Sequence, residues 1–222
     1  MTPRRNALTR ERVIGAALAI VDRNGLDALT MRALGRELGV DPMAVYHHLP
    51  NKAAVLDGVV EAVLAQVRLT TEPALDWTER LAALARRYRD ALRAHPNTLP
   101  LVATRTDVTP PALAVLDRAV EILLDAGVDP PRALLAVHAL SCFLVGHALD
   151  ELGLGADAGE PGEAARQREL VGSGAYPSLA MAATEAADAG PEDSFELGLA
   201  ALLRGLSEIA QGGLRADAEP RR

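Results

Sequence analysis

The sequence predicts an all-α protein, with an N-terminal three-helix unit that contains a helix-turn-helix and a larger helical domain behind it. Three observations support this fold class. Apolar residues recur every three or four positions along most of the chain, which is the period of an amphipathic helix. Proline and glycine stand at the ends of these segments, where helices begin and end. Residues 30–52 have the capping and turn residues of two short helices joined by a tight turn.

The composition is that of a globular protein. The chain has 222 residues, of which 49% are hydrophobic, and this length is sufficient to bury a core. Its single cysteine, Cys142, excludes an intrachain disulfide and suits a reducing compartment, so we expect a cytoplasmic protein. We expect no membrane partner, because no stretch reads as a membrane span and the first residues lack the apolar centre of a signal peptide.

The net charge of −7 is unevenly distributed. Residues 1–60 contain eight Lys or Arg and six Asp or Glu, a net charge of +2, which leaves −9 on the remainder. A slightly basic N-terminal part on an acidic body is typical of a molecule that presents one end to nucleic acid.

The first helix is expected to begin near Thr9, with Glu11 favourably placed in its first turn. Gly25 should end it, because glycine accepts the left-handed conformation of a helix cap. The residues predicted to face the core share one side of this helix. They are Val13, Ile14, Ala17, Leu18 and Val21.

The helix-turn-helix follows directly. Thr30 is a suitable N-cap for its first helix, in which Leu34 and Leu38 share a face, and Gly39 suits the turn. Asp41 then caps the second helix, which starts at Pro42 and stops before Pro50.

In the second helix Val45 and Leu49 should point inward. The residues left facing outward are Met43, Ala44, Tyr46, His47 and His48. The second helix of a helix-turn-helix enters the major groove of DNA, and we interpret this surface accordingly. Tyr46 and His47 can donate to phosphates, and Met43 or Ala44 can touch a thymine methyl group.

Two cations fit the same interpretation. Arg32 can reach a guanine edge or a phosphate. Lys52 stands at the start of the next helix, where the macrodipole disfavours a cation unless a phosphate docks beside the Asn51 cap. Alternatively, Lys52 is a solvated surface residue, since helix-turn-helix shapes also occur in proteins that do not bind DNA.

The pattern of the remaining sequence predicts a helical domain. We therefore divide the protein into two predicted domains, residues 1–67 and 68–222. The expected helices span 52–67, 76–94, 112–126, 131–152, 179–187 and 194–211, with a short helical or irregular piece at 99–102. The helix at 52–67 would join the two domains without a flexible linker, so it could transmit a rotation. Residues 153–173 are rich in Gly, Ala and charge and are expected to form a loop.

Two of these helices have unusual surfaces. The helix at 131–152 is apolar nearly all round, which places it at the centre of a domain or between a core and a partner chain. The last helix carries Gly198 and Gly205, which are most easily explained where another helix approaches closely.

The N-terminal block resembles the DNA-binding domain of TetR-type transcriptional repressors. It reads TRERVIGAALAIVDRNGLDALTMRALGRELGVDPMAVYHHLPNKAAVLDGV. The resemblance lies in the spacing of Leu29-Thr30, Leu38-Gly39-Val40, Tyr46, His48 and Asn51-Lys52. The later segments TLPLVATR, FLVGHALDELG, YPSL and FELGLAALLRGL are similar to the C-terminal domain of the tetracycline repressor subgroup.

The resemblance implies a homodimer that binds a double-stranded DNA operator. Helices 131–152 and 194–211 of both chains would form a four-helix bundle. A small-molecule effector bound in the C-terminal domain of each chain would alter the separation of the two DNA-binding domains. By motif position, the operator contacts would be Thr30, Arg32, Pro42, Met43, Ala44, Tyr46, His47, His48 and Lys52. Met43 and His47 depart from the tetracycline repressor's own residues, which affects the operator sequence and not the docking mode.

The resemblance also implies a ligand pocket, but not its usual ligand. In the tetracycline repressor a histidine three residues before a Thr-Arg pair holds magnesium, and alignment on Thr104-Arg105 puts Leu101 at that position. Leucine cannot ligate a metal, and Ala119 replaces a second polar contact, so we expect a hydrophobic pocket without metal. Its lining would be Leu84, Tyr88, Leu101, Val102, Leu116, Val120, Leu135, His138, Cys142 and His147.

The sequence does not favour an enzyme. His138 and Cys142 have the i, i+4 spacing of metal ligands, but His147 lies about half a turn out of phase with His138. Contacts to ligand or core therefore explain these side chains better than a metal does. There is no glycine-rich phosphate loop and no nucleophile elbow, and we expect no cofactor.

Two functions remain. The favoured one is a dimeric DNA-binding transcriptional regulator, a repressor released from its operator by a small hydrophobic ligand. The alternative is a small-molecule-binding or helical interaction protein without DNA binding.

Overall fold

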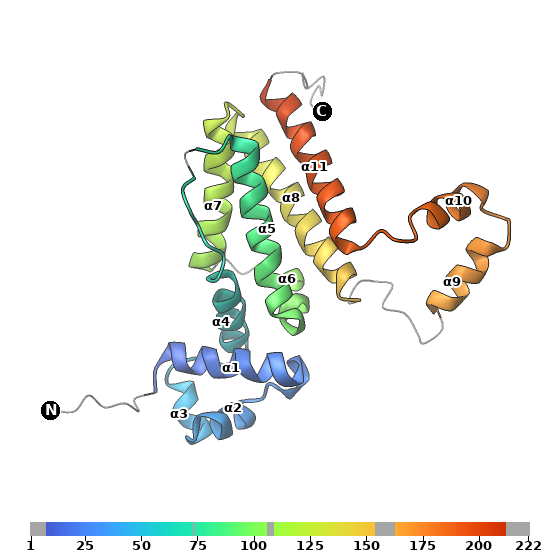
Figure 1. Cartoon of the computed structure of the whole chain (residues 1–222). Coiled ribbons are helices and arrows are strands. Elements are labelled where there is room, and N and C mark those ends of the chain that lie inside the picture. Colours follow the sequence, from blue (N-terminus) through green and yellow to red (C-terminus); the bar gives the residue numbers. More distant parts are fainter. Residues whose placement is uncertain (1–7, 73, 106–108, 154–162, 212–222) are drawn as a thin grey trace, which may run out of the picture. The chain divides into compact units, whose positions relative to one another are not determined.

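The computed structural model describes residues 8–72, 74–105, 109–153 and 163–211, which form helices, turns and connecting segments with no β-strand among them. This confirms the predicted all-α class (Figure 1). The α-helices are α1 Arg10–Asn24, α2 Met31–Leu38, α3 Pro42–Tyr46, α4 Lys52–Leu64, α5 Trp77–Ala94, α6 Leu99–Thr104, α7 Pro110–Asp125, α8 Pro130–Glu151, α9 Glu163–Gly172, α10 Pro177–Glu185 and α11 Pro191–Ala210. Two short 3-10 helices, η1 Leu26–Ala28 and η2 Pro96–Thr98, precede α2 and α6.

The chain divides into two compact units, residues 1–148 and 149–222. In the first unit we call α1–α4 the reading head and α5–α8 the body. Helix α4 leads from the head into the body, where it packs against α5 and α7 (Figure 1). The second unit contains α9 and α10, which pack against each other, and α11.

The reading head is built on the crossing of α1 and α4. Val13, Ala17, Val55 and Val59 are fully buried in its core. Gly58 permits the close approach, because a Cβ at this position would lie 2.7 Å from the Ile14 side chain. A two-pronged ion pair from Arg10 to Glu61 (2.6 and 3.1 Å) joins the two helices, and its hydrogen bonds raise the pKa of Arg10.

The predicted helix starts of the head are confirmed. The hydroxyl of Thr9 accepts from the Arg12 N–H, and that of Thr30 accepts from the Ala33 N–H at 3.0 Å. Further along, the Asp41 carboxylate accepts from the Met43 N–H and the Asn51 amide oxygen from the Ala54 N–H, both at 2.8 Å. Each side chain thus satisfies one of the unpaired N–H groups of a helix start.

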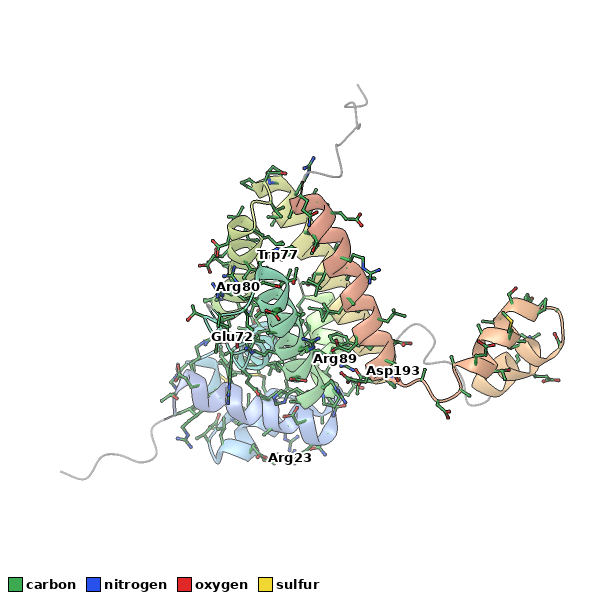
Figure 2. The ribbon with its side chains drawn as sticks, turned by 45° about the horizontal axis from the view of Figure 1, so that its top comes forward. Arg23, Glu72, Trp77, Arg80, Arg89 and Asp193 are labelled. Carbon is green, nitrogen blue, oxygen red and sulfur yellow. The ribbon has the colours of Figure 1, made fainter. Side chains whose placement is uncertain are left out.

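The body packs α5 against α7. Asp76 and Glu79 form a reciprocal capping box at the start of α5. One turn further on, Arg80 (labelled in Figure 2) forms an ion pair with Asp125 of α7 at 3.3 Å. The segment that precedes α5 is held to it by an ion pair between Glu72 and Arg87.

Several element boundaries differ from the sequence prediction. Helix α3 ends at Tyr46, before the predicted stop at Pro50, although Leu49 is still buried. Helices α7 and α11 begin two and three residues early, because Pro110 and Pro191 suit the first turn of a helix.

The prediction of a loop over residues 153–173 is wrong for α9. The segment EAARQRELVG consists mostly of strong helix formers, which outweigh the glycines around them. Residues 154–162 lie outside the described part of the chain.

From the sequence we expect no segment long and apolar enough to span a membrane, and α8 does not meet this expectation. Helix α8 is long and apolar enough by length and composition, and 28% of its most apolar window is buried. Core helices of soluble proteins meet the same criterion.

Candidate functional site

The recognition surface predicted from the sequence lies on α3. Val45 is fully buried and fixes the inner side of this short helix. On the other side Met43 is 67% exposed and Tyr46 is 39% exposed, and His47 just beyond the helix is also exposed. A large apolar side chain held in solvent on a capped helix is available to contact the edges of bases.

The turn before α3 depends on Gly35, a residue that the sequence pattern did not single out. A Cβ on Gly35 would lie 3.0 Å from the Val40 carbonyl oxygen and 3.1 Å from the Pro42 ring. Gly35 therefore lets α2 and α3 meet closely, while Gly39 takes the left-handed conformation (φ 68°) that ends α2. The spacing of Gly35 within the helix-turn-helix was the only signal for its role.

Positive and polar groups flank α3. Arg32 near the start of α2 and Lys52 at the first position of α4 are both exposed, and neither has an ion pair with any residue that the structure describes. Thr30 is exposed too, whereas Pro42, Ala44 and His48 are half-buried. The N-terminus of α4 thus presents a lysine, an Asn51 cap and unpaired N–H groups together, an arrangement suited to a phosphate.

The predicted ligand residues fall into two groups. Leu101 belongs to the core of the reading head, and Tyr88 and Val102 pack against that core. Burial raises the pKa of the Tyr88 hydroxyl to about 12. Leu84 is buried in α5, and Val120 is half-buried in α7.

The second group lies toward the outside of α7 and α8. Leu116 is 41% exposed and Leu135 is 68% exposed. His138 and Cys142 are also exposed, with the His138 Nε2 3.7 Å from the Cys142 Sγ. His147 is half-buried beside Phe143, with the ring centroids 5.8 Å apart. The structure does not gather all of the predicted ligand residues around one cavity.

The structure shows a cavity of about 450 Å³ in the reading head. Its lining residues are Ile20, Arg23, Asn24, Ala28, Ala33, Arg36 and Glu37. Two of these lining residues, Arg23 (labelled in Figure 2) and Glu37, form an ion pair of 2.9 Å. None of the predicted ligand residues lines this cavity. In the described ranges no group of three or more His, Cys, Asp or Glu is placed to hold a metal ion.

Comparison with known proteins gives two family matches. Residues 13–59 match the model of bacterial regulatory proteins of the tetR family, and residues 70–210 match the tetracyclin repressor-like C-terminal domain. Together the matches cover the helix-turn-helix and nearly all of the chain beyond it.

Individual relatives and solved structures indicate the same family. The class A tetracycline repressor protein from transposon 1721 of Escherichia coli is 37% identical over 200 residues, covering 88% of this chain and 89% of the relative. ActR from Streptomyces coelicolor, solved in complex with actinorhodin, has a TM-score of 0.78 at 27% identity and covers 94% of this chain and 97% of its own. BioQ, solved with its double-stranded DNA operator, has a TM-score of 0.66 at 25% identity, with coverages of 90% and 99%.

Members of this family are regulators and not enzymes. They bind DNA operators and small-molecule ligands, and they form dimers. A capped helix-turn-helix with an exposed recognition face and a helical domain behind it is the arrangement found here. This chain is therefore a transcriptional regulator that belongs to the tetR family.

Proposed function

We propose that this regulator is a cytoplasmic repressor that binds its operator as a homodimer and leaves it when a small hydrophobic ligand binds the body. The observation that carries the DNA-binding part is the exposure of Met43 and Tyr46 on α3, a helix whose other face is locked by the buried Val45.

In the proposed complex α3 enters the major groove. Met43, Tyr46 and His47 lie at its exposed surface and contact bases or nearby phosphates, with Pro42 and Ala44 against the groove wall. The backbone contacts come from Thr30, Arg32, His48 and Lys52. In a symmetric dimer the two recognition helices stand about 34–36 Å apart, one turn of DNA.

The proposed dimer interface uses residues 131–152 and 194–211. Leu134 is 65% exposed and Leu135 is 68% exposed on α8, and Leu197 is 74% exposed on α11. Covering these leucines with a second copy would remove apolar surface from water, which is favourable by about 25 cal/mol for each Å² buried. In the tetR family, dimers are typical.

The proposed effector is apolar and needs no metal. Leu101 provides no metal ligand, and the side chains offered by α5, α7 and α8 are largely apolar, with His138, Cys142 and His147 as the polar contacts. ActR was solved with actinorhodin, which shows that a neighbour of this fold accepts a small molecule other than tetracycline.

Salt-dependent DNA binding tests the proposal. A duplex is first selected from random sequences with the purified protein, and its dissociation constant is measured from 50 to 200 mM salt. Replacing both Arg32 and Lys52 by alanine removes four proposed phosphate contacts from the dimer and should reduce the slope of log K against log salt by about 3.6, about 0.9 for each contact. Arg80→Ala, which removes an ion pair inside the body, is the matched control and should leave the slope unchanged.

If no duplex is enriched, or if binding does not depend on salt, the alternative of a small-molecule-binding protein without DNA binding gains support. Mass spectrometry of a compound that co-purifies with the protein would then identify the ligand class.

A further inference from the structure

A polar joint ties the reading head to the body at the C-terminal end of α1. The Asn97 side chain, in η2, donates from Nδ2 to the carbonyl oxygens of Val21 (3.1 Å) and Asp22 (3.0 Å). These carbonyls belong to the last turn of α1, and that of Val21 also accepts from the Gly25 N–H at 2.8 Å. The body thus supplies part of the C-terminal cap of a head helix.

His95 forms the second set of polar contacts at this joint. Its Nδ1 lies 2.9 and 3.0 Å from the two carboxylate oxygens of Asp22, and its Nε2 lies 2.8 Å from the Gln66 Nε2. Gln66 follows α4 and also donates to the Ala62 carbonyl oxygen at 3.2 Å. An imidazole that donates from Nδ1 and accepts at Nε2 satisfies all of these partners at once. The joint therefore connects α1, α4 and the segment after α5.

The same body segment is attached to the head at its other end. Arg105 forms an ion pair with Asp57 of α4 and donates to the Ala53 carbonyl oxygen at 3.4 Å. Between the two attachments, Leu99 and Leu101 are buried. Beside the packing of Leu101 in the head core, these polar contacts hold the head at two separated points, one near the end of α1 and one on α4.

A small rotation at this joint would displace the helices that carry the recognition surface. Helix α1 packs against α2, which carries α3. Since α1 has 15 residues it is about 22 Å long, so a swing of about 5° around its Arg10–Glu61 attachment moves the far end by about 2 Å. A recognition surface has to be held within about 0.5 Å to read base edges well.

We propose that His95 and Asn97 are positioning residues for operator binding: they hold the end of α1, and through it the recognition helix, at one orientation relative to the body. This inference rests on the DNA-binding function proposed above. Neither residue lies on the DNA-contacting surface, so their effect on affinity passes through α1.

The test measures orientation and affinity separately. Spin labels are attached at Arg36 in the head and Leu124 in the body, in a Cys142→Ser background, and labelled chains are diluted with unlabelled protein. Pulsed electron paramagnetic resonance then gives the head–body distance distribution without DNA. Operator affinity is measured on proteins that keep Cys142, using the duplex selected by the parent protein.

Asn97→Ala and His95→Ala should each broaden the distance distribution and weaken operator binding about fivefold, the effect of about one hydrogen bond. Asn97→Asp should have a larger effect at the same side-chain size, because its carboxylate faces the α1 carbonyl oxygens. His95→Ala and Asp22→Ala combined should weaken binding no more than His95→Ala alone, since the His95–Asp22 interaction is already lost in that variant. Arg80→Gln, inside the body, should change neither readout.

An unchanged distance distribution in the Asn97 and His95 variants would overturn the proposal, as would a broadened distribution with unchanged affinity. Should the parent protein bind no duplex, the function proposed above fails, while the distance measurement still decides whether the joint sets the orientation of the head.

Discussion

The reading head and helix α8 use their apolar residues in opposite ways. In the head, Val13, Leu34 and Val45 are fully buried by neighbouring helices of the same chain, and each helix start is capped. Helix α8 buries one side through Val137 and Leu144 but leaves Leu135 exposed. Among the described residues, the head buries the apolar side of each of its helices, whereas α8 keeps large apolar side chains exposed.

The largest expected effect is a loss of stability in the reading head. Leu34→Ala removes a fully buried side chain at the contact of α2 with its neighbours and should lower the free energy of unfolding by about 2–5 kcal/mol. Urea denaturation followed by circular dichroism measures this. The matched change Leu116→Ala, at a 41% exposed position, should cost far less. Equal losses at the two sites would contradict the contrast between buried and exposed leucines.

The next effect concerns α8. Leu134→Asp places a charge on the face that we assign to the partner chain, and it should raise the dimer dissociation constant at least a hundredfold, because an unpaired charge is costly to bury. Sedimentation equilibrium measures the change, and Glu121→Gln on the exposed side of α7 serves as the control. A variant that dimerises as tightly as the parent would show that this face lies outside the interface.

A smaller loss of stability is expected at the N-cap of α2 in the reading head. Thr30→Ala removes the hydroxyl that accepts from the Ala33 N–H and should destabilise the head by about 1 kcal/mol. Thr30→Ser keeps the acceptor and should retain most of that stability. Thermal unfolding of the two variants distinguishes a capping role from a DNA contact alone, because the measurement contains no DNA.

The smallest expected effect is a pH dependence in the body. A hydrogen bond from the Thr78 hydroxyl, together with the Glu79 N–H, lowers the pKa of Asp76 from its ordinary value of 3.8. Because the folded-state pKa is the lower one, this carboxylate stabilises α5 fully above pH 3.8 and loses that contribution as the pH falls through the folded-state value. In acid titrations followed by circular dichroism, Asp76→Asn should flatten the low-pH loss slightly; a steeper loss would reverse the sign of the argument.

Local features of the fold were predictable from the sequence. Thr9, Thr30 and Asp41 act as caps because a cap needs only residues two or three positions away. The exposed face of α3 followed from the same short-range periodicity. Helix α9 was missed because the glycines and charges around it favour a loop, although the segment itself consists mostly of helix-forming residues.

The candidate ligand site could be predicted only in part. Sequence periodicity predicted that Tyr88 faces inward, and the family resemblance placed Leu101 in the pocket, but neither showed that they pack in or against the core of the reading head. Likewise, His138 and Cys142 share a helical face by spacing, while their exposure depends on what covers α8.

The sequence by itself determined the helices, their caps and the family to which the chain belongs, since these depend on neighbouring residues and on motif spacing. Only the tertiary structure decided how the body holds the head. The Asn97 contact with Val21 joins residues 76 positions apart, and the Arg105 contact with Ala53 joins residues 52 apart. Such contacts arise from the packing of α1, α4 and α6, which no local pattern encodes.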